Sequence, residues 1–267
     1  MISLFLDEVT MLAAGRFAAA PGAEEVTGVQ VDSRRVAPGD LFVAVGRGSE
    51  FLDDALARGA AATLVPEEPF TAFAALGAAV RDRSNARVVG ITGSTGKTST
   101  KDILAALCAP AARTVAAEAS FNNEIGVPLT LCRLEPDTEV CILELAMRGF
   151  GQIADLCVVA RPDVGVVTNV GPVHLELVGS LEGVLRAKSE LIAALPPGGT
   201  AIVPEEFPVE REDVEGQDIH LDRRDDAGLF LLREKGRPGH LGDAEKERER
   251  GAKRGHRSPP EDAAIST

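Results

Sequence analysis

A glycine-rich turn near residue 90 lies between a short apolar run and an amphipathic run, and residues 90–100 read Gly-Ile-Thr-Gly-Ser-Thr-Gly-Lys-Thr-Ser-Thr. The run 88–92 is typical of a buried strand, and the run 97–109 is typical of a helix. Glycines let backbone N–H groups approach a phosphate chain closely, and the first turn of a helix adds a fixed positive end. A strand, such a turn and a helix in this order predict a phosphate-binding loop in an α/β fold.

The side chains that end this loop suit a nucleoside triphosphate. Lys97 can neutralise the β and γ phosphates, and the hydroxyl of Thr98 can ligate Mg²⁺. The spacing departs from the usual phosphate loop, because the glycine before Gly96 is Gly93 and Gly90 lies one residue too early. A glycine-rich turn with a surface lysine is the less favoured alternative. We expect ATP to be bound by these residues: Thr92, Gly93, Ser94, Thr95, Gly96, Lys97, Thr98 and Ser99.

Strand-like and helix-like runs alternate through the first 204 residues. The runs typical of strands are 27–32, 41–45, 62–65, 88–92, 139–145, 164–170 and 200–203. The runs typical of helices are 51–60, 71–80, 97–109, 125–134, 152–159 and 181–195. Such alternation predicts an α/β fold with a mostly parallel sheet and helices on both faces. A short polar segment at 83–86 suggests a small N-terminal α/β domain at 1–84 and a P-loop central domain at 85–204.

The composition changes after Pro204. Residues 205–267 are far richer in charged side chains than the chain average of 26%, and three of the four histidines lie among them. Periodicity is lost apart from a short apolar run at 229–232. Such a segment buries too little apolar surface to offset its ordering entropy. We therefore predict a disordered charged tail at 205–267, and a central domain that is truncated, or incomplete, at 204.

Charge and composition exclude several classes of partner. The net charge is −13 and the pI is about 4.8, so most of the surface repels phosphate backbones. Aromatic residues make up 4% of the chain, with no Trp and no Tyr, which weakens any base-stacking account of nucleic-acid binding. No apolar run is long enough to span a membrane, and the N-terminus lacks a basic targeting region. We expect a cytoplasmic protein that binds neither nucleic acid nor membrane.

The loop variant at 92–98 resembles the ATP site of the Mur ligase superfamily, which includes folylpolyglutamate synthetase and cyanophycin synthetase. Further segments match the superfamily in the expected order, so that the resemblance covers about residues 20–204. These segments are Asp-Ser-Arg at 32–34, Pro-Gly-Asp-Leu-Phe-Val-Ala at 38–44, Asn-Asn-Glu-Ile-Gly-Val-Pro-Leu-Thr at 122–130, Glu144, Thr-Asn at 168–169, His174, and Ala-Lys-Ser-Glu at 187–190.

The resemblance implies an ATP-dependent amide ligase of peptidoglycan precursor synthesis. ATP would phosphorylate a carboxylate of a UDP-linked substrate, and an amine would attack the resulting acyl phosphate. The run at 122–128 favours the branch that joins D-alanyl-D-alanine to UDP-N-acetylmuramoyl-tripeptide. Two alternatives stay open. One is another ligase of the superfamily (a ligase that adds the third residue of the peptide, or one of the folylpolyglutamate or cyanophycin type), and the other is a non-catalytic ATP-binding fragment.

The resemblance also implies roles for individual residues. Lys97 would brace the phosphates, and Thr98 and Glu144 would hold one Mg²⁺. His174 would bind a second Mg²⁺, and Lys188 would be carbamylated to an anion that helps to organise that metal. Without the resemblance, Glu144 reads as a solvated charge at the end of a strand, and Lys188 reads as an exposed helical lysine.

The substrate residues implied by the resemblance lie in both predicted domains. Ser33 and Arg34 would contact the UDP part of the substrate, since the fork of an arginine suits a pyrophosphate. Asn123 and Thr130 would line the substrate channel. Relatives of this kind are longer and carry a further domain that closes over ATP and binds the amine. We therefore expect weak ATP binding, and little or no ligation, from this chain alone.

Overall fold

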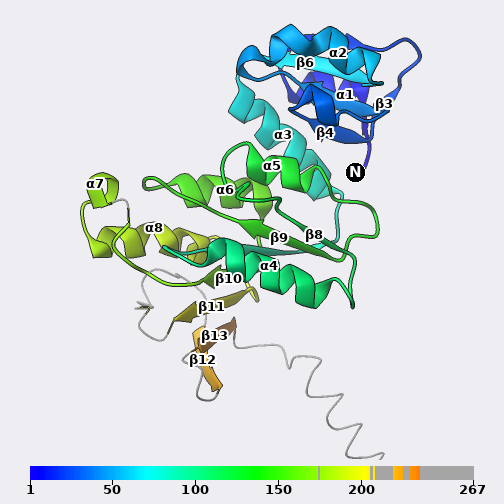
Figure 1. Cartoon of the computed structure of the whole chain (residues 1–267). Coiled ribbons are helices and arrows are strands. Elements are labelled where there is room, and N and C mark those ends of the chain that lie inside the picture. Colours follow the sequence, from blue (N-terminus) through cyan, green and yellow to red (C-terminus); the bar gives the residue numbers. More distant parts are fainter. Residues whose placement is uncertain (174, 205–206, 208–218, 225–228, 235–267) are drawn as a thin grey trace, which may run out of the picture.

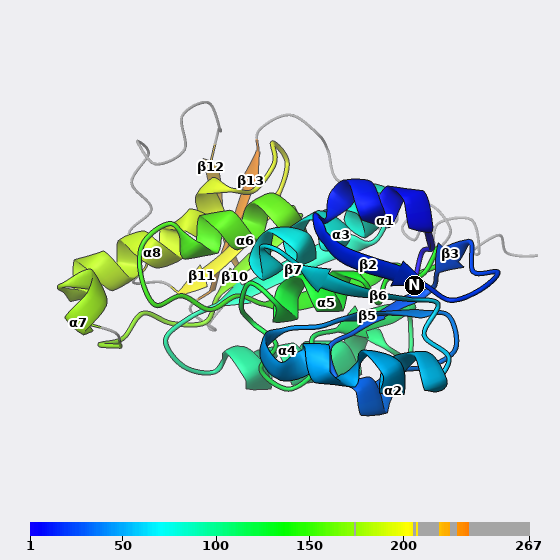
Figure 2. The same cartoon turned by 90° about the horizontal axis from the view of Figure 1, so that it is seen from above.

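The computed structural model describes residues 1–173, 175–204, 207, 219–224 and 229–234. Its described part contains two α/β units, and each is built around its own sheet (Figure 1). The N-terminal unit lies above the central unit in Figure 1. In Figure 2 the N-terminal unit lies to one side of the central unit, and α7 and α8 extend on the other side.

The N-terminal unit has a four-stranded sheet with the order β2-β6-β5-β4. Its strands are β2 (Gly15–Ala19), β4 (Gly28–Gln30), β5 (Asp40–Val43) and β6 (Ala62–Pro66). Neighbouring strands are parallel except for β2, which runs antiparallel to β6. A separate antiparallel pair joins β1 (Leu4–Phe5) to β3 (Glu25–Val26). The helical elements are α1 (Leu6–Leu12), η1 (Ser33–Arg35), η2 (Gly46–Phe51), α2 (Leu52–Ala57) and α3 (Pro69–Asp82).

The central unit has a seven-stranded sheet with the order β12-β13-β11-β10-β7-β9-β8. Its first five strands along the chain are β7 (Arg87–Thr92), β8 (Thr114–Ala116), β9 (Val140–Glu144), β10 (Val164–Val167) and β11 (Thr200–Pro204). These five pair with one another in parallel, as the alternation of runs predicts. β7 lies between β10 and β9, so the turn that follows β7 leaves the sheet near its middle.

Helices cover both faces of this sheet, which confirms the predicted architecture (Figure 1). They are α4 (Lys97–Cys108), α5 (Gly126–Leu131), α6 (Gln152–Ala160) and α8 (Leu181–Ala193), and the short α7 (Leu175–Val178) packs against α8. Side chains alternate across the two faces because the strand period is two. Ile91 and Ile142 pack towards α4, whereas Val88 and Leu143 belong to the larger core, which also includes buried residues of α3, α5, α6 and α8.

α3 joins the two units. It packs against α5 and α6 of the central unit and against α1 of the N-terminal unit. The contact with α5 is close, because a Cβ added at Gly77 would lie 2.9 Å from both Cα and Cβ of Pro128. The division predicted between residues 84 and 85 falls after this helix and stays a prediction, since α3 contacts elements on both sides of it.

The structure differs from the predicted disordered tail at two segments. β12 (Ile219–Arg224) and β13 (Leu229–Glu234) are antiparallel strands, and β13 pairs with β11. An unpaired edge at β11 would leave a row of backbone N–H and C=O groups without partners. The apolar run at 229–232 supplies a strand that satisfies them. Apart from Phe207, the other residues of the predicted tail lie outside the described part of the chain.

None of the helices in the described part of the chain is long and apolar enough to cross a membrane. The four cysteines are free, and Cys132, Cys141 and Cys157 are buried. Burial raises the pKa of each of these three thiols to about 12. They behave as small core side chains.

Candidate active site

The glycine-rich turn leaves the carboxyl end of β7 and leads directly into α4. Gly93 has φ +147°, and a Cβ at this position would lie 1.8 Å from Oγ1 of Thr168. Gly96, the residue before the helix, has φ +81°. Both conformations favour glycine, and the crowding at Gly93 leaves no room for any side chain. Both glycines thus fit a loop that ends at the start of a twelve-residue helix, and the N-terminus of a helix favours a bound phosphate.

The segment after β10 braces this loop. Asn169 accepts from the backbone N–H of Thr95 at 2.9 Å and donates to the Thr95 hydroxyl at 2.7 Å. Gly171 and the Ser94 hydroxyl exchange two further hydrogen bonds, of 2.8 and 3.0 Å. Thr168 donates to the Thr95 carbonyl at 2.6 Å. The Thr-Asn pair at 168–169 is thus placed against the phosphate loop, where it holds the loop in one shape.

Lys97 and Lys188 bring two positive charges to the same place. Nζ of Lys97 donates to the Gly93 carbonyl at 2.8 Å, so the side chain folds back over the loop. Lys188 is only 2% exposed, although the sequence pattern alone favours an exposed helical lysine. Burial, together with the positive charge of Lys97, lowers the pKa of Lys188 to about 8. A lysine with such a pKa is partly neutral near neutral pH.

Glu144 ends β9 beside the start of α4 and is 2% exposed. The Thr98 hydroxyl donates to one of its carboxylate oxygens at 2.8 Å, and Nδ2 of Asn122 donates to the other at 2.8 Å. A buried carboxylate needs such partners, because an unpaired charge in the interior is costly. Three polar side chains from α4, β9 and the loop after β8 therefore form one constellation at the mouth of the phosphate loop.

This constellation fits a magnesium ion. Mg²⁺ prefers oxygen ligands and is usually held by one or two carboxylates together with substrate phosphates. The Thr98 hydroxyl and the Glu144 carboxylate supply such oxygens next to the loop. Within the described residues, no cluster of three or more His, Cys, Asp or Glu side chains could hold a metal without other ligands. His174, the predicted ligand of a second metal, lies outside the described residues.

Thr92 carries a buried polar atom at the same site. It is 1% exposed, and among the described residues its hydroxyl oxygen is the one buried side-chain N or O atom without a hydrogen-bond partner. Buried hydroxyls normally find a partner, so an unsatisfied one at the foot of a phosphate loop indicates a place where a ligand or water completes the site. Ser99 follows Thr98 on the first turn of α4 and is exposed.

The predicted substrate residues fall into two groups. Ser33 and Arg34 lie together in η1, directly after β4. Arg34 donates through Nε and Nη2 to Asp32 at 2.8 and 2.7 Å, and these hydrogen bonds lower the pKa of Asp32 to about 2. The Arg34 side chain is 80% exposed, so its fork points into solvent apart from this pairing.

The other two substrate candidates serve α5. Asn123 is exposed and accepts from the backbone N–H of Gly126 at 2.9 Å, at the start of the helix. Thr130 is 1% exposed, and its hydroxyl donates to the Gly126 carbonyl at 2.8 Å. The structure therefore leaves Asn123 accessible and places Thr130 inside the helix packing.

Three functional candidates were not assigned by the sequence. Asn122 lies in the matched run at 122–130, but nothing in that run separates it from its neighbour Asn123. Lys101 reads as an ordinary helical lysine, yet it is 2% exposed. Glu190 is a third case, because it accepts from the backbone N–H groups of Gly151 and Ala154 at the start of α6. These roles depend on contacts between distant segments, which no local spacing indicates.

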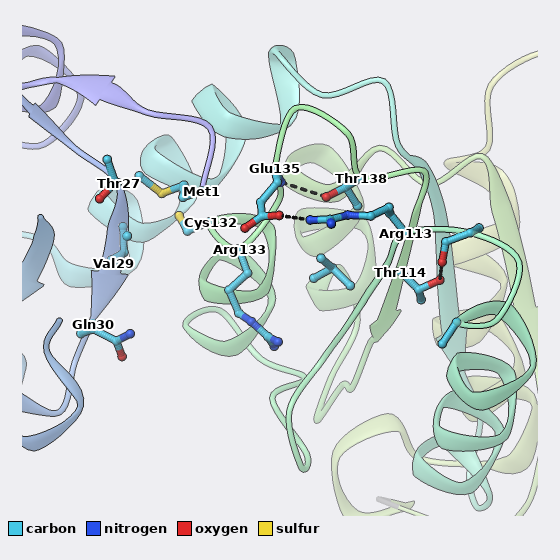
Figure 3. Close-up of a pocket in the computed structure, with 14 residues that line it drawn as sticks. Met1, Thr27, Val29, Gln30, Arg113, Thr114, Cys132, Arg133, Glu135 and Thr138 are labelled. Carbon is cyan, nitrogen blue, oxygen red and sulfur yellow. Dashed lines mark hydrogen bonds and ion pairs between the residues drawn. The ribbon is translucent and has the colours of Figure 1, made fainter. Parts of the chain in front are cut away.

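A cavity of about 540 Å³ lies between the two units (Figure 3), and its lining includes no residue of the phosphate loop. Met1 and residues 27–30 line it from the N-terminal unit, and Arg113 and Arg133 line it from the central unit. Arg113 already pairs with two carboxylates, and Arg133 donates to a backbone carbonyl and pairs with Glu118. Both arginines that line the cavity are thus engaged within the protein.

The chain is similar to several known proteins. The model of the Mur ligase middle domain matches residues 91–220. The UDP-N-acetylmuramoyl-tripeptide–D-alanyl-D-alanine ligase of Synechocystis is 38% identical over 67% of this chain and 43% of its own length. The ligase of the same name from Escherichia coli is 38% identical over 76% of this chain and 48% of its own length. The chain thus spans about half the length of the curated relatives it matches.

Solved structures show the same likeness. A crystal structure of MurF from Acinetobacter baumannii matches with a TM-score of 0.67 and 28% identity, over 82% of this chain and 56% of that one. The MurF ligase of Thermotoga maritima, solved in complex with ADP, matches with a TM-score of 0.60 and 30% identity, over 77% of this chain and 57% of that one.

Proposed function

Because the chain belongs to the Mur ligase superfamily, we propose that it carries the nucleotide-binding and UDP-substrate-binding residues of an ATP-dependent ligase that joins D-alanyl-D-alanine to UDP-N-acetylmuramoyl-tripeptide. The observation that carries this proposal is the constellation of Thr98, Glu144 and Asn122 at the mouth of the phosphate loop. The names of the relatives support this pair of substrates over those of the other ligases of the superfamily.

The first chemical step would be the transfer of the γ-phosphoryl group of ATP to the terminal carboxylate of the tripeptide, which yields an acyl phosphate and ADP. Phosphoryl transfer depends mainly on positioning and on neutralising charge. Lys97 would leave the Gly93 carbonyl and reach the phosphates at the N-terminus of α4. The amine of D-alanyl-D-alanine would then attack the acyl carbon, and inorganic phosphate would leave as the amide forms.

Magnesium would supply charge neutralisation between the β and γ phosphates, and Thr98 and Glu144 are the residues proposed to hold it. Asn122 fixes the orientation of the Glu144 carboxylate by donating to its second oxygen. His174 completes the proposed metal ligands. Lys188 is the proposed site of carbamylation. Only a neutral amine reacts with CO₂, and the lowered pKa of Lys188 favours the neutral form.

Ser33 and Arg34 are proposed to bind the UDP part of the substrate. η1 lies next to the central unit, because Arg35 donates to Glu118 at 2.9 Å. The Arg34 fork is exposed at this boundary between units, and a pyrophosphate could replace Asp32 as its bidentate partner. Asn123 is a candidate for lining the path of the peptide, since it is exposed in the same loop region.

Ligand-induced thermal stabilisation tests this proposal, because it needs only binding by residues that the chain contains. We expect Mg²⁺-ATP and UDP-N-acetylmuramoyl-tripeptide each to raise the melting temperature, since a ligand that binds only the folded state stabilises it. UDP-N-acetylmuramoyl-dipeptide, which lacks the third amino acid, is the matched control and should protect less. Lys97→Ala should abolish protection by ATP but keep protection by the UDP substrate.

Equal protection by the tripeptide and dipeptide substrates would favour a ligase that adds the third residue. Protection by ATP but by neither UDP substrate would favour a non-catalytic nucleotide-binding role. A companion assay adds bicarbonate and D-alanyl-D-alanine and follows phosphate release. Release that requires both substrates and Lys97 would establish ligation by this chain, and would contradict the sequence-based expectation of little or no ligation.

A further inference from the structure

Lys101 is a buried lysine that the chemistry above does not use. It lies on α4, one turn after Lys97, and its side chain is 3% exposed. Lysines are rarely buried to this degree unless their charge is paired and their donors are satisfied. A buried ammonium next to a phosphate site is therefore expected to have a partner for each of its donors.

All three donors of the Lys101 ammonium have acceptors. Nζ donates to the backbone carbonyl of Ala117 at 2.8 Å and to that of Ala119 at 3.0 Å. It also pairs with the carboxylate of Asp102 at 2.8 Å. An ammonium group has three hydrogens, so this set uses its full capacity. Two of the three partners belong to one loop, the segment 117–123 that follows β8.

The loop 117–123 has a backbone shape that needs support. Ala119 has φ +45°, a left-handed conformation that costs a residue with a Cβ on the order of 1 kcal/mol or more. The loop is anchored at its end by the N–H of Ala146, which donates to the Asn122 carbonyl at 2.9 Å. Because the Ala119 carbonyl is one of the two that Lys101 binds, the ammonium holds the strained residue in place.

The same loop contacts both parts of the proposed site. Asn122 donates to Glu144, the candidate metal ligand, and Glu118 pairs with Arg35 of η1 at 2.9 Å. The loop therefore lies between the metal constellation and the substrate-binding segment of the N-terminal unit. A residue that fixes this loop would fix the direction from which the Asn122 amide reaches the Glu144 carboxylate.

We propose that Lys101 is a positioning residue that holds the loop 117–123 by its carbonyls, so that Asn122 orients Glu144 for the metal–nucleotide complex. This proposal rests on the proposed function. Groups that orient a metal ligand typically change metal affinity by roughly ten- to a hundredfold when they are removed. Lys101 acts on Glu144 indirectly, through the backbone of the loop and through Asn122. It touches neither nucleotide nor substrate.

Hydrogen exchange on the full chain tests the mechanical part of the proposal without any ligand. In Lys101→Met, the N–H of Ala146 and the N–H of Phe121 should exchange at least about tenfold faster than in the wild-type chain, because the loop opens more easily. Asp102→Asn is the matched control. It removes the charge of the exposed partner but keeps both carbonyl contacts, so it should leave these rates unchanged. Unchanged rates in Lys101→Met would overturn the proposal.

Nucleotide affinity with and without Mg²⁺ tests the link to the metal. The ratio of ATP affinity in Mg²⁺ to that in EDTA should fall roughly tenfold in Lys101→Met, while affinity in EDTA changes less than twofold. Asn122→Ala keeps the loop backbone and should show the same fall. The double variant should be no worse than either single variant, because both changes break one chain of contacts.

Two outcomes would contradict the proposal here. Additive losses in the double variant would mean that Lys101 does not act through Asn122. An equal loss of affinity with and without Mg²⁺ would mean a general structural role. If the wild-type chain shows no Mg²⁺-dependent binding at all, the proposed function fails and the metal role of Lys101 fails with it. The exchange rates would then still decide whether Lys101 holds the loop.

Discussion

The hydroxyl of Thr98 donates a 2.8 Å hydrogen bond to the carboxylate of Glu144, which lies 46 residues further along the chain. The two residues meet because β7 and β9 are parallel neighbours, so the turn after one strand and the end of the other lie at the same edge of the sheet. Ligands of open α/β sheets bind at that edge. The parallel pairing of β7 and β9 thus brings the side-chain oxygen atoms of Thr98 and Glu144 together.

Thr98→Val removes one of these oxygens and leaves the shape of the side chain. We expect affinity for Mg²⁺-ATP to fall roughly tenfold or more, with little change for ATP in EDTA, because a metal ligand is lost. Stability should fall by about 1 kcal/mol, since Glu144 loses a donor. Isothermal titration in both buffers measures the effect. Thr100→Val, the same change two residues along α4, is the control, and an equal effect from it would contradict the assignment.

Gly93→Ala tests the close approach of the phosphate loop to Thr168. The new Cβ would lie 1.8 Å from Oγ1 of Thr168, and the residue would keep a φ of +147° that a Cβ disfavours. We expect a loss of about 2 kcal/mol or more in the free energy of unfolding, together with loss of ATP binding. Urea denaturation and a nucleotide titration measure the two effects.

Gly149→Ala is the matched control for that substitution. A Cβ at Gly149 meets no heavy atom within 4 Å. Its stability should therefore stay within about 0.5 kcal/mol of the wild-type value. A Gly93→Ala variant as stable as this control would mean that the loop can move away from Thr168, and that the glycine is not required for the fold.

Much of the central unit could be predicted from the sequence because its signals are local. The apolar strand, the glycines and the helix around Lys97 follow one another without interruption, and the structure places β7 and α4 within two residues of the expected bounds. β2 was missed because its residues are mostly exposed, so they lack a strand's apolar pattern. β8 was missed as well, because its three residues are all half-buried and do not alternate between buried and exposed positions.

The burial of particular side chains could not be predicted in the same way. Lys188 and Lys101 have the sequence context of surface lysines, yet both are 2% exposed. Their environment is set by segments that are distant in the chain, such as the loop 117–123 beside Lys101. The resemblance pointed to Lys188 but not to Lys101. The pairing of β13 with β11 was missed for a similar reason, since a charged segment can still complete a sheet edge.

Gly77→Ala tests the contact between α3 and α5 that holds the two units together. In an open helix this change stabilises by about 1 kcal/mol, because glycine is a poor helix former. Here the new Cβ would lie 2.9 Å from Cα and Cβ of Pro128, so we expect destabilisation by about 1–3 kcal/mol instead. Ala78→Gly, at the next position of α3, reports the helix propensity alone. A more stable Gly77→Ala variant would show that the helices are not in close contact.

The pH dependence of stability tests the buried position of Lys188. Burial and Lys97 lower the pKa of Lys188 from 10.5 to about 8 in the folded chain. Between these two values the unfolded chain binds more protons at this residue than the folded chain does, so stability should rise as pH increases from about 8 to 10.5. Below pH 8 both states are protonated, and the unfavourable burial of the charge is fully present.

Lys188→Met removes this titration and keeps an apolar side chain of similar length. In buffers free of CO₂, to prevent carbamylation, the stability of the wild-type chain relative to this variant should increase by on the order of 2–3 kcal/mol across the window. Urea denaturation at closely spaced pH values measures the difference, in which other titrating groups cancel. A difference that stays flat from pH 8 to 10.5 would mean that Lys188 keeps an ordinary pKa and reaches solvent. The lysine would then lack the neutral amine that reaction with CO₂ requires.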